Sequence, residues 1–318
     1  MTKQLLILYI LLSLFTNSVI SQQTNSLDDY STYLPEVRAF NQQLAHRLIP
    51  PPDSNAKTKI KPVIKYIDGR IDKLSLRVFK PTTIRAVVLD IHGGGWCGGM
   101  AAFDDTFNDE MARECKVAVV SIDYHLAPPL SACINDCTAA AKWLVNNALR
   151  EFGSDKLFIS GGSAGGHLAA VTTLYIRDSL HAIDKVKGVN LLYGIFDVSG
   201  TPSIKMATDS TLFINKSTLD YVNDLLFQGW DVNQLKNSKY SPLYANLNSL
   251  PPALFTVGTY DPFIDDSYFM EARWRLAGNK TFLAVYPECS HAFNTFPTKI
   301  AKVANERIYK WIISLCTK

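Results

Sequence analysis

The chain has 318 residues, of which 47% are hydrophobic and 19% charged, and these proportions are those of an ordinary globular protein. A chain of this length can bury an ample core, as one large domain or as two unequal ones. Its formal charge is only +3 at pH 7, without a block of basic residues, which excludes the electrostatic footprint of a nucleic-acid-binding protein.

The first residues have the pattern of a targeting segment. Lys3 precedes an apolar run at 5–15, and small residues follow it before Gln22. The run is shorter than the roughly 20 apolar residues of a membrane-spanning helix and fits the core of a signal peptide. We expect a signal peptide over 1–21 and export to the secreted, periplasmic or lumenal space, with no stable membrane span after cleavage. An uncleaved membrane anchor is the alternative.

The six cysteines do not reveal a disulfide pairing by their spacing. Cys133 and Cys137 are expected on one face of a helix, where parallel side chains give poor disulfide geometry. Further ligands at zinc-site spacing do not accompany them. We therefore expect several buried free thiols and predict neither a metal nor a cofactor. Asn215 and Asn279 begin glycosylation sequons.

Residues 22–60 are polar and interrupted by prolines, with one helix expected near 35–48. We interpret them as an N-terminal cap segment. Beyond them, residues 63–67 and 74–79 alternate between apolar and polar, which predicts two antiparallel strands joined by a turn.

Nearly continuous apolar runs follow and alternate with helical patterns. Strands are expected at 85–91, 117–123, 157–159 and 189–193, with helices at 104–115, through 133–144 and at 167–175. Apolar strands that alternate with helices form a parallel sheet covered on both faces. Such sheets place their chemistry at the carboxyl ends of the strands.

Residues 198–247 interrupt this alternation. They are polar, contain two expected helices, the clearer at 218–227, and carry several aromatic residues. A connection of about fifty residues is too long for a simple loop, so we interpret it as an inserted cap region. The pattern resumes with strands at 252–258 and 281–286 and a helix at 298–314. The catalytic core would thus comprise 61–197 and 248–318.

The sequence G-G-S-A-G at 161–165 joins a strand to a helix, which is the context of a nucleophile elbow. The glycines permit a sharp turn that exposes the Ser163 hydroxyl beside a helix N-terminus. A serine nucleophile needs a general base that an acid holds in place, and this fold supplies them in the order serine, acid, histidine. His291, after the last strand, is the predicted base, and Asp261, after strand 252–258, is the predicted acid.

Other polar residues near these positions have structural interpretations. Asp265 and Asp266 are expected in the first turn of a helix, where negative charge is stabilising. Asp197 is interpreted as a turn residue. His92 is expected to orient its loop, and His167 to pack against its neighbours.

A second glycine-rich motif, H-G-G-G at 92–95, also follows a predicted strand. Its backbone amides can approach a ligand because no side chain blocks them. We predict that Gly93 and Gly94, together with Ala164, form an oxyanion hole.

Together these motifs resemble the hormone-sensitive lipase family of α/β-hydrolases, which includes bacterial carboxylesterases and arylacetamide deacetylase. The resemblance covers residues 61–318 and rests on H-G-G-G-W at 92–96, D-Y-H-L-A-P at 123–128, G-G-S-A-G-G at 161–166, S-P-L-Y-A-N-L-N-S-L-P-P at 241–252, G-T-Y-D-P at 258–262, R-L-A-G at 275–278 and S-H-A-F at 290–293. It implies an α/β-hydrolase fold with a mostly parallel central sheet, helices on both faces and a helical cap. It also implies that Ser163, Asp261 and His291 act as nucleophile, acid and base. Two positions depart from the family: Gly162 replaces its usual aspartate and His125 its usual arginine.

We therefore expect an exported serine carboxylesterase that hydrolyses short- to medium-chain acyl esters of small molecules through an acyl-enzyme. An amidase, N-deacetylase or lactonase is the alternative, because the same machinery serves each. A different class is a non-catalytic ligand-binding homologue, such as the plant gibberellin receptor. Such binders lose a triad member, whereas this sequence keeps all three.

Overall fold

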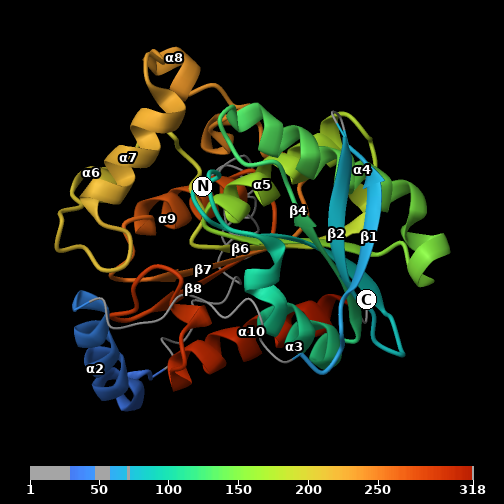
Figure 1. Cartoon of the computed structure of the whole chain (residues 1–318), viewed down its shortest axis with the longest axis horizontal. Coiled ribbons are helices and arrows are strands. Elements are labelled where there is room, and N and C mark those ends of the chain that lie inside the picture. The colour runs from blue at the N-terminus through green and yellow to red at the C-terminus, as the bar shows by residue number, and fades with distance from the viewer. Residues whose placement is uncertain (1–28, 47–57, 70–71, 317–318) are drawn as a thin grey trace, which may run out of the picture. The chain divides into compact units, whose positions relative to one another are not determined.

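The computed structural model describes residues 29–46, 58–69 and 72–316 (Figure 1). The expected signal peptide at 1–21 lies outside these residues, as does part of the segment 22–60. The chain divides into two compact units, Met1–Thr32 and Tyr33–Lys318, and only residues 29–32 of the first are described. Within the described ranges, no helix is both long and apolar enough to cross a bilayer.

The second unit is built on one eight-stranded sheet in the order β1-β2-β4-β3-β5-β6-β7-β8. The strands are β1 (Val63–Asp68), β2 (Lys73–Phe79), β3 (Ala86–Ile91), β4 (Val117–Asp123), β5 (Leu157–Gly162), β6 (Val186–Leu192), β7 (Ala253–Gly258) and β8 (Thr281–Tyr286). The pairs β1–β2 and β2–β4 are antiparallel and every other pair is parallel. The predicted α/β class and mostly parallel sheet are confirmed.

One strand starts earlier than the sequence predicts. β6 begins at Val186, three residues before the predicted start at residue 189. The prediction started late because Lys187 and Gly188 interrupt the apolar pattern. A Cβ atom at Gly188 would lie 2.6 Å from the Trp311 ring. The glycine thus lets a large side chain pack onto the sheet.

Helices cover both faces of the sheet (Figure 1). One face packs against α4 (Leu130–Phe152), α5 (Ala164–Asp178) and α9 (Ile264–Leu276), and the other against α3 (Asp105–Cys115) and α10 (Lys299–Cys316). Successive side chains of β3 point to opposite faces of the sheet. Leu89 and Ile91 belong to the core cluster that includes apolar residues of α4 and α5. Each such apolar side chain contributes about 1.5–3 kcal/mol by burial.

The helix predicted near 35–48 is α2 (Leu34–Ala45). Its Arg38 guanidinium donates two hydrogen bonds to the Glu288 carboxylate, at 2.7 and 2.6 Å, and its Phe40 ring lies 4.8 Å from the Phe296 ring. The helix therefore lies against the loop that follows β8. No described residue of α2 lines the cavity of the candidate site.

Three α-helices lie between β6 and β7: α6 (Pro202–Lys205), α7 (Lys216–Phe227) and α8 (Val232–Leu235), and a 3-10 helix (Pro242–Tyr244) follows them. Asn215 caps α7 by accepting a hydrogen bond from the Thr218 amide at 3.0 Å, a typical helix N-cap. Asp231 and Gln234 form a capping box on α8. The three α-helices stand together in Figure 1, away from α3 and α10.

All six cysteines lie in the described part of the chain and are free thiols. Cys97 is half-buried and the other five are buried. The expectation of several buried free cysteines is confirmed.

Candidate active site

The predicted elbow is a strained turn between β5 and α5. Ser163 has φ of +58° and ψ of −124°, a conformation that costs a non-glycine residue on the order of 1–3 kcal/mol. The positions two residues before and two residues after it must be glycine, because a Cβ atom at Gly161 would lie 2.3 Å from the Gly165 carbonyl oxygen and one at Gly165 would lie 1.9 Å from the Ile91 carbonyl oxygen. The Ser163 amide donates to the Leu192 carbonyl at 2.9 Å, which ties the turn to the end of β6.

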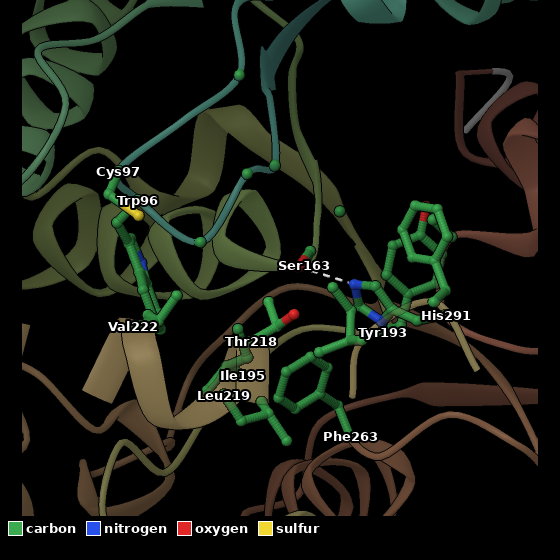
Figure 2. Close-up of a pocket in the computed structure, with 18 of the residues that line it drawn as sticks. Trp96, Cys97, Ser163, Tyr193, Ile195, Thr218, Leu219, Val222, Phe263 and His291 are labelled. Carbon is green, nitrogen blue, oxygen red and sulfur yellow. Dashed lines mark hydrogen bonds between the residues drawn. The ribbon is translucent and has the colours of Figure 1, made fainter. Parts of the chain in front are cut away.

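The three residues of the predicted triad meet at this turn (Figure 2). His291 Nε2 lies 2.9 Å from Ser163 Oγ, and His291 Nδ1 lies 2.8 Å from Asp261 Oδ2. Asp261 Oδ1 accepts the amide of Phe263 at 2.8 Å, so the carboxylate is held at both oxygens. Because a carboxylate can only accept, Nδ1 carries the proton and Nε2 presents a lone pair to the serine hydroxyl.

Aromatic rings surround the imidazole of His291. The rings of Tyr193 and Phe263 meet it edge-on, at centroid distances of 4.7 and 5.0 Å. Phe213 lies farther away, at 6.3 Å. His291 is 2% exposed, so these rings restrict its motion and exclude water from it.

The H-G-G-G loop lies directly against the elbow. A Cβ atom at Gly93 would be 3.0 Å from the Gly162 carbonyl oxygen and 3.3 Å from Ser163 Cβ, so a side chain there would push the loop away. Gly94 has φ of +114°, which favours glycine. Within the described ranges, the amides of Gly93 and Gly94 donate to no other group. They remain available to an oxyanion beside the serine, as does that of Ala164, the first residue of α5.

Two histidines contact this loop: His92 was predicted to orient it, and His167 was predicted to pack against its neighbours. His92 Nδ1 donates to the Gly93 carbonyl at 2.7 Å, and its ring stacks on Tyr124 at 4.1 Å. His167 is fully buried: its Nδ1 accepts the Trp96 indole N–H at 3.1 Å, and its Nε2 donates to the Tyr240 carbonyl at 2.8 Å. Burial lowers the pKa of His92 and lowers that of His167 to about 4, so both are neutral structural residues at neutral pH.

The competing acids have structural roles, as expected. Asp266 is buried and accepts hydrogen bonds from the Phe196 and Asp197 amides at 2.6 and 3.0 Å. Burial raises its pKa to about 7. Asp265 accepts the Ser203 amide at 2.8 Å. Asp197 accepts the Ser199 amide in a turn, at 2.9 Å.

His125, which replaces the family's arginine, lies between two carboxylates. Its Nδ1 lies 2.6 Å from Asp136 Oδ2 and its Nε2 lies 3.1 Å from Asp72 Oδ1. The hydrogen bond to Asp136, more than any other cause, raises the pKa of His125. A protonated imidazole can therefore bridge two carboxylates, as a guanidinium would.

A cavity of about 740 Å³ opens over the serine and extends to residues of α6 and α7. Figure 2 shows its apolar wall, to which Ile195, Leu219 and Val222 contribute. The aromatic residues Trp96, Phe213 and Phe227 also line the cavity, whereas Trp230 packs against Phe227 and Tyr240. In the described part of the chain, no histidine, cysteine and carboxylate side chains cluster so as to hold a metal ion.

Asp90 and Tyr193 line the cavity but were not predicted from the sequence. Asp90 is buried within β3 and accepts hydrogen bonds from Asn108 Nδ2 and Ser121 Oγ, both at 2.8 Å. Burial raises its pKa to about 6 and raises that of Asp104 well above the ordinary value. A carboxylate inside an apolar strand was the available signal for Asp90. Tyr193 carried no such signal.

Comparison with known proteins agrees with this geometry. Residues 88–295 match the family described as alpha/beta hydrolase fold. An arylesterase of Saccharolobus solfataricus is 30% identical over 251 residues, which cover 76% of this chain and 78% of that protein. The carboxylesterase NlhH of Mycobacterium tuberculosis is 29% identical over 269 residues, 80% of this chain and 81% of that protein.

A solved structure is similar over most of the chain. The hyperthermophilic esterase from the archaeon Pyrobaculum calidifontis superimposes with a TM-score of 0.79 at 26% identity, covering 89% of this chain and 99% of the esterase. The chain therefore belongs to the alpha/beta hydrolase family, which confirms the resemblance read from its motifs. Its relatives and its fold make it a carboxylic ester hydrolase.

Proposed function

We propose that this hydrolase cleaves short- to medium-chain acyl esters through an acyl-enzyme on Ser163. One observation carries the proposal: a serine hydroxyl 2.9 Å from a histidine nitrogen, at the floor of an apolar cavity. The alcohol part of the substrate would leave toward the open side of the cavity. The acyl part would remain bonded to the serine until water removes it.

Each step uses a group whose position is described above. His291 Nε2 takes the Ser163 proton as Oγ attacks the ester carbonyl carbon, and Asp261 stabilises the imidazolium. The amides of Gly93, Gly94 and Ala164 stabilise the tetrahedral oxyanion, by roughly 3–4 kcal/mol per donor. Nε2 then protonates the departing alcohol. Water repeats the sequence: His291 takes its proton, the hydroxide attacks the acyl carbon, and Ser163 leaves with that proton.

The apolar wall of the cavity predicts how rate depends on acyl length. For p-nitrophenyl esters, kcat/KM should rise by up to roughly fourfold for each methylene that the cavity buries, and fall once the chain outgrows it. Initial rates across saturated acyl chains, from acetate to palmitate, measure this profile. A kcat/KM that climbs without a maximum to palmitate would contradict the proposed range.

The same panel separates the ester hydrolase from its alternatives. Amides and N-acetyl compounds, each compared with the ester of the same acyl group, should react more slowly, because an amine is a poorer leaving group than an alcohol. A lactone also releases an alcohol, so its rate is compared directly with that of the best open-chain ester. Faster hydrolysis of a matched amide or lactone than of the ester would make that alternative the function. A non-catalytic binder would hydrolyse none of them.

We further propose that the chain is exported, on the support of the apolar run at 5–15. Full-length protein expressed with its leader should appear outside the cytoplasm with Gln22 as its first residue. N-terminal sequencing of the purified protein measures this. A membrane-bound product that keeps residues 1–21 would support the anchor instead, and an intact cytoplasmic product would contradict export.

Only one of the two sequons is compatible with a glycan in the folded protein. The Asn279 side chain is buried and donates to the Leu247 and Trp274 carbonyls, at 2.7 and 3.0 Å. A glycan would replace one of the two hydrogens on that nitrogen, which removes at least one of these bonds, and it would have no room at a buried side chain. If the host glycosylates the protein, Asn215 at the start of α7 is the site open to modification.

A further inference from the structure

We propose that Tyr193 is a positioning residue that braces the nucleophile turn and the histidine loop against each other. The proposal rests on the triad roles given under Proposed function. It concerns a residue that takes no proton from the substrate and acts only through His291. Four contacts of this one side chain and its backbone carry it.

The backbone places Tyr193 immediately after β6, at the base of the elbow. The carbonyl of the preceding residue, Leu192, accepts the Ser163 amide at 2.9 Å, and the Tyr193 amide donates to the Thr256 carbonyl at 2.7 Å. Tyr193 has φ of +38°, which bulky residues seldom adopt. This conformation is held between two strands and directs the phenol between the elbow and His291 (Figure 2).

On one side the phenol fills the space next to Gly162. A Cβ atom at position 162 would lie 3.1 Å from Tyr193 Cε2 and 3.3 Å from its hydroxyl oxygen. The family's usual aspartate would therefore have to displace the ring. This contact gives the departure at Gly162 a physical reason: the space beside the elbow is filled by Tyr193, the residue that follows β6, and not by a side chain at position 162.

On the other side the phenol holds the loop that carries the base. Its edge meets the His291 ring at 4.7 Å and 64°, and its hydroxyl donates to Asn294 Oδ1 at 2.5 Å. Asn294 is anchored in turn to Asn305 of α10, by one bond in each direction at 3.1 and 3.0 Å. The hydroxyl thus connects the end of β6 to the last helix across the histidine loop.

Loss of this bond should loosen His291 without removing any triad atom. The imidazole would then spend part of its time turned away from Asp261 and Ser163. Fewer molecules would hold the reactive geometry, so kcat should fall while substrate contacts, and KM, remain.

Tyr193→Phe tests this, because it removes the hydroxyl and keeps the ring. We expect kcat to fall roughly tenfold, the rate equivalent of one buried hydrogen bond, with KM within about twofold of wild type. Tyr309→Phe is the matched control: its hydroxyl also donates to a side chain, Glu110, but it lies on α10 away from the cavity. That variant should keep the wild-type kcat and KM.

A double-mutant cycle with Asn294→Ala identifies the partner. If the hydroxyl acts through Asn294, the double variant should be no slower than the slower single variant, because both remove the same bond. Thermal unfolding of each variant ensures that rates are compared on folded protein. A wild-type kcat in Tyr193→Phe, or losses that multiply in the double variant, would overturn the proposal. The proposed function fails separately, if wild-type protein shows no Ser163-dependent ester hydrolysis.

Discussion

Ser163→Ala should lower the hydrolysis of short p-nitrophenyl esters by at least roughly 10⁴-fold, because the nucleophile of a serine triad supplies most of its rate enhancement. The variant should fold normally. The strained backbone of Ser163 is fixed by the hydrogen bond from its amide to the Leu192 carbonyl and by the helix that follows, and neither needs the hydroxyl. Rates with p-nitrophenyl butyrate and labelling by a fluorophosphonate probe measure the loss. Wild-type protein should be labelled and the variant should not.

Ser160→Ala is the matched control for this prediction. Ser160 lies three residues earlier, on β5, where its buried hydroxyl accepts a hydrogen bond from Asn190 Nδ2 at 3.1 Å. Its removal should leave both labelling and turnover close to wild type. If labelling persisted in Ser163→Ala and disappeared in Ser160→Ala, the nucleophile would be Ser160 and the assignment to Ser163 would be wrong.

The elbow and its partners could be predicted because local sequence determines their surroundings. Glycines on both sides of Ser163 are required by contacts shorter than any side chain permits, and they leave a readable pattern. Asp261 and His291 each follow an apolar strand, and the carboxyl ends of parallel strands meet at one edge of a sheet. Chain order alone therefore brought together residues that are far apart in sequence.

Contacts that depend on distant packing could not be predicted. Tyr193 follows an ordinary apolar strand, and its positive φ and its bond to Asn294 exist only once β6, β7 and α10 are assembled. The docking of α2 through Arg38 and Glu288 joins segments 250 residues apart, which no local pattern indicates. The start of β6 was missed because Gly188 weakens the strand signal to make room for Trp311.

Asp261→Asn should lower kcat by roughly 10⁴-fold although the two side chains have nearly the same shape, because the amide favours the wrong imidazole tautomer. In the native site Oδ2 accepts the proton on His291 Nδ1 at 2.8 Å. The Phe263 amide already donates to Oδ1, so an asparagine would keep its oxygen there and turn its NH₂ group toward Nδ1. Nδ1 would then have to accept, and the proton would move to Nε2. A protonated Nε2 cannot take the proton of Ser163.

Asp265→Asn separates this effect from a general change of charge. Asp265 is a second carboxylate close to Asp261 in the sequence. It accepts a hydrogen bond from the Ser203 amide and none from His291. An asparagine oxygen can accept the same bond, so kcat should stay within about twofold of wild type, since that hydrogen bond is retained. Steady-state kinetics of both variants near pH 7 give the comparison. Equal losses in the two would mean that negative charge near α9 matters and the tautomer does not. A large loss confined to Asp261→Asn, with KM little changed, would place the acid of the triad at the end of β7.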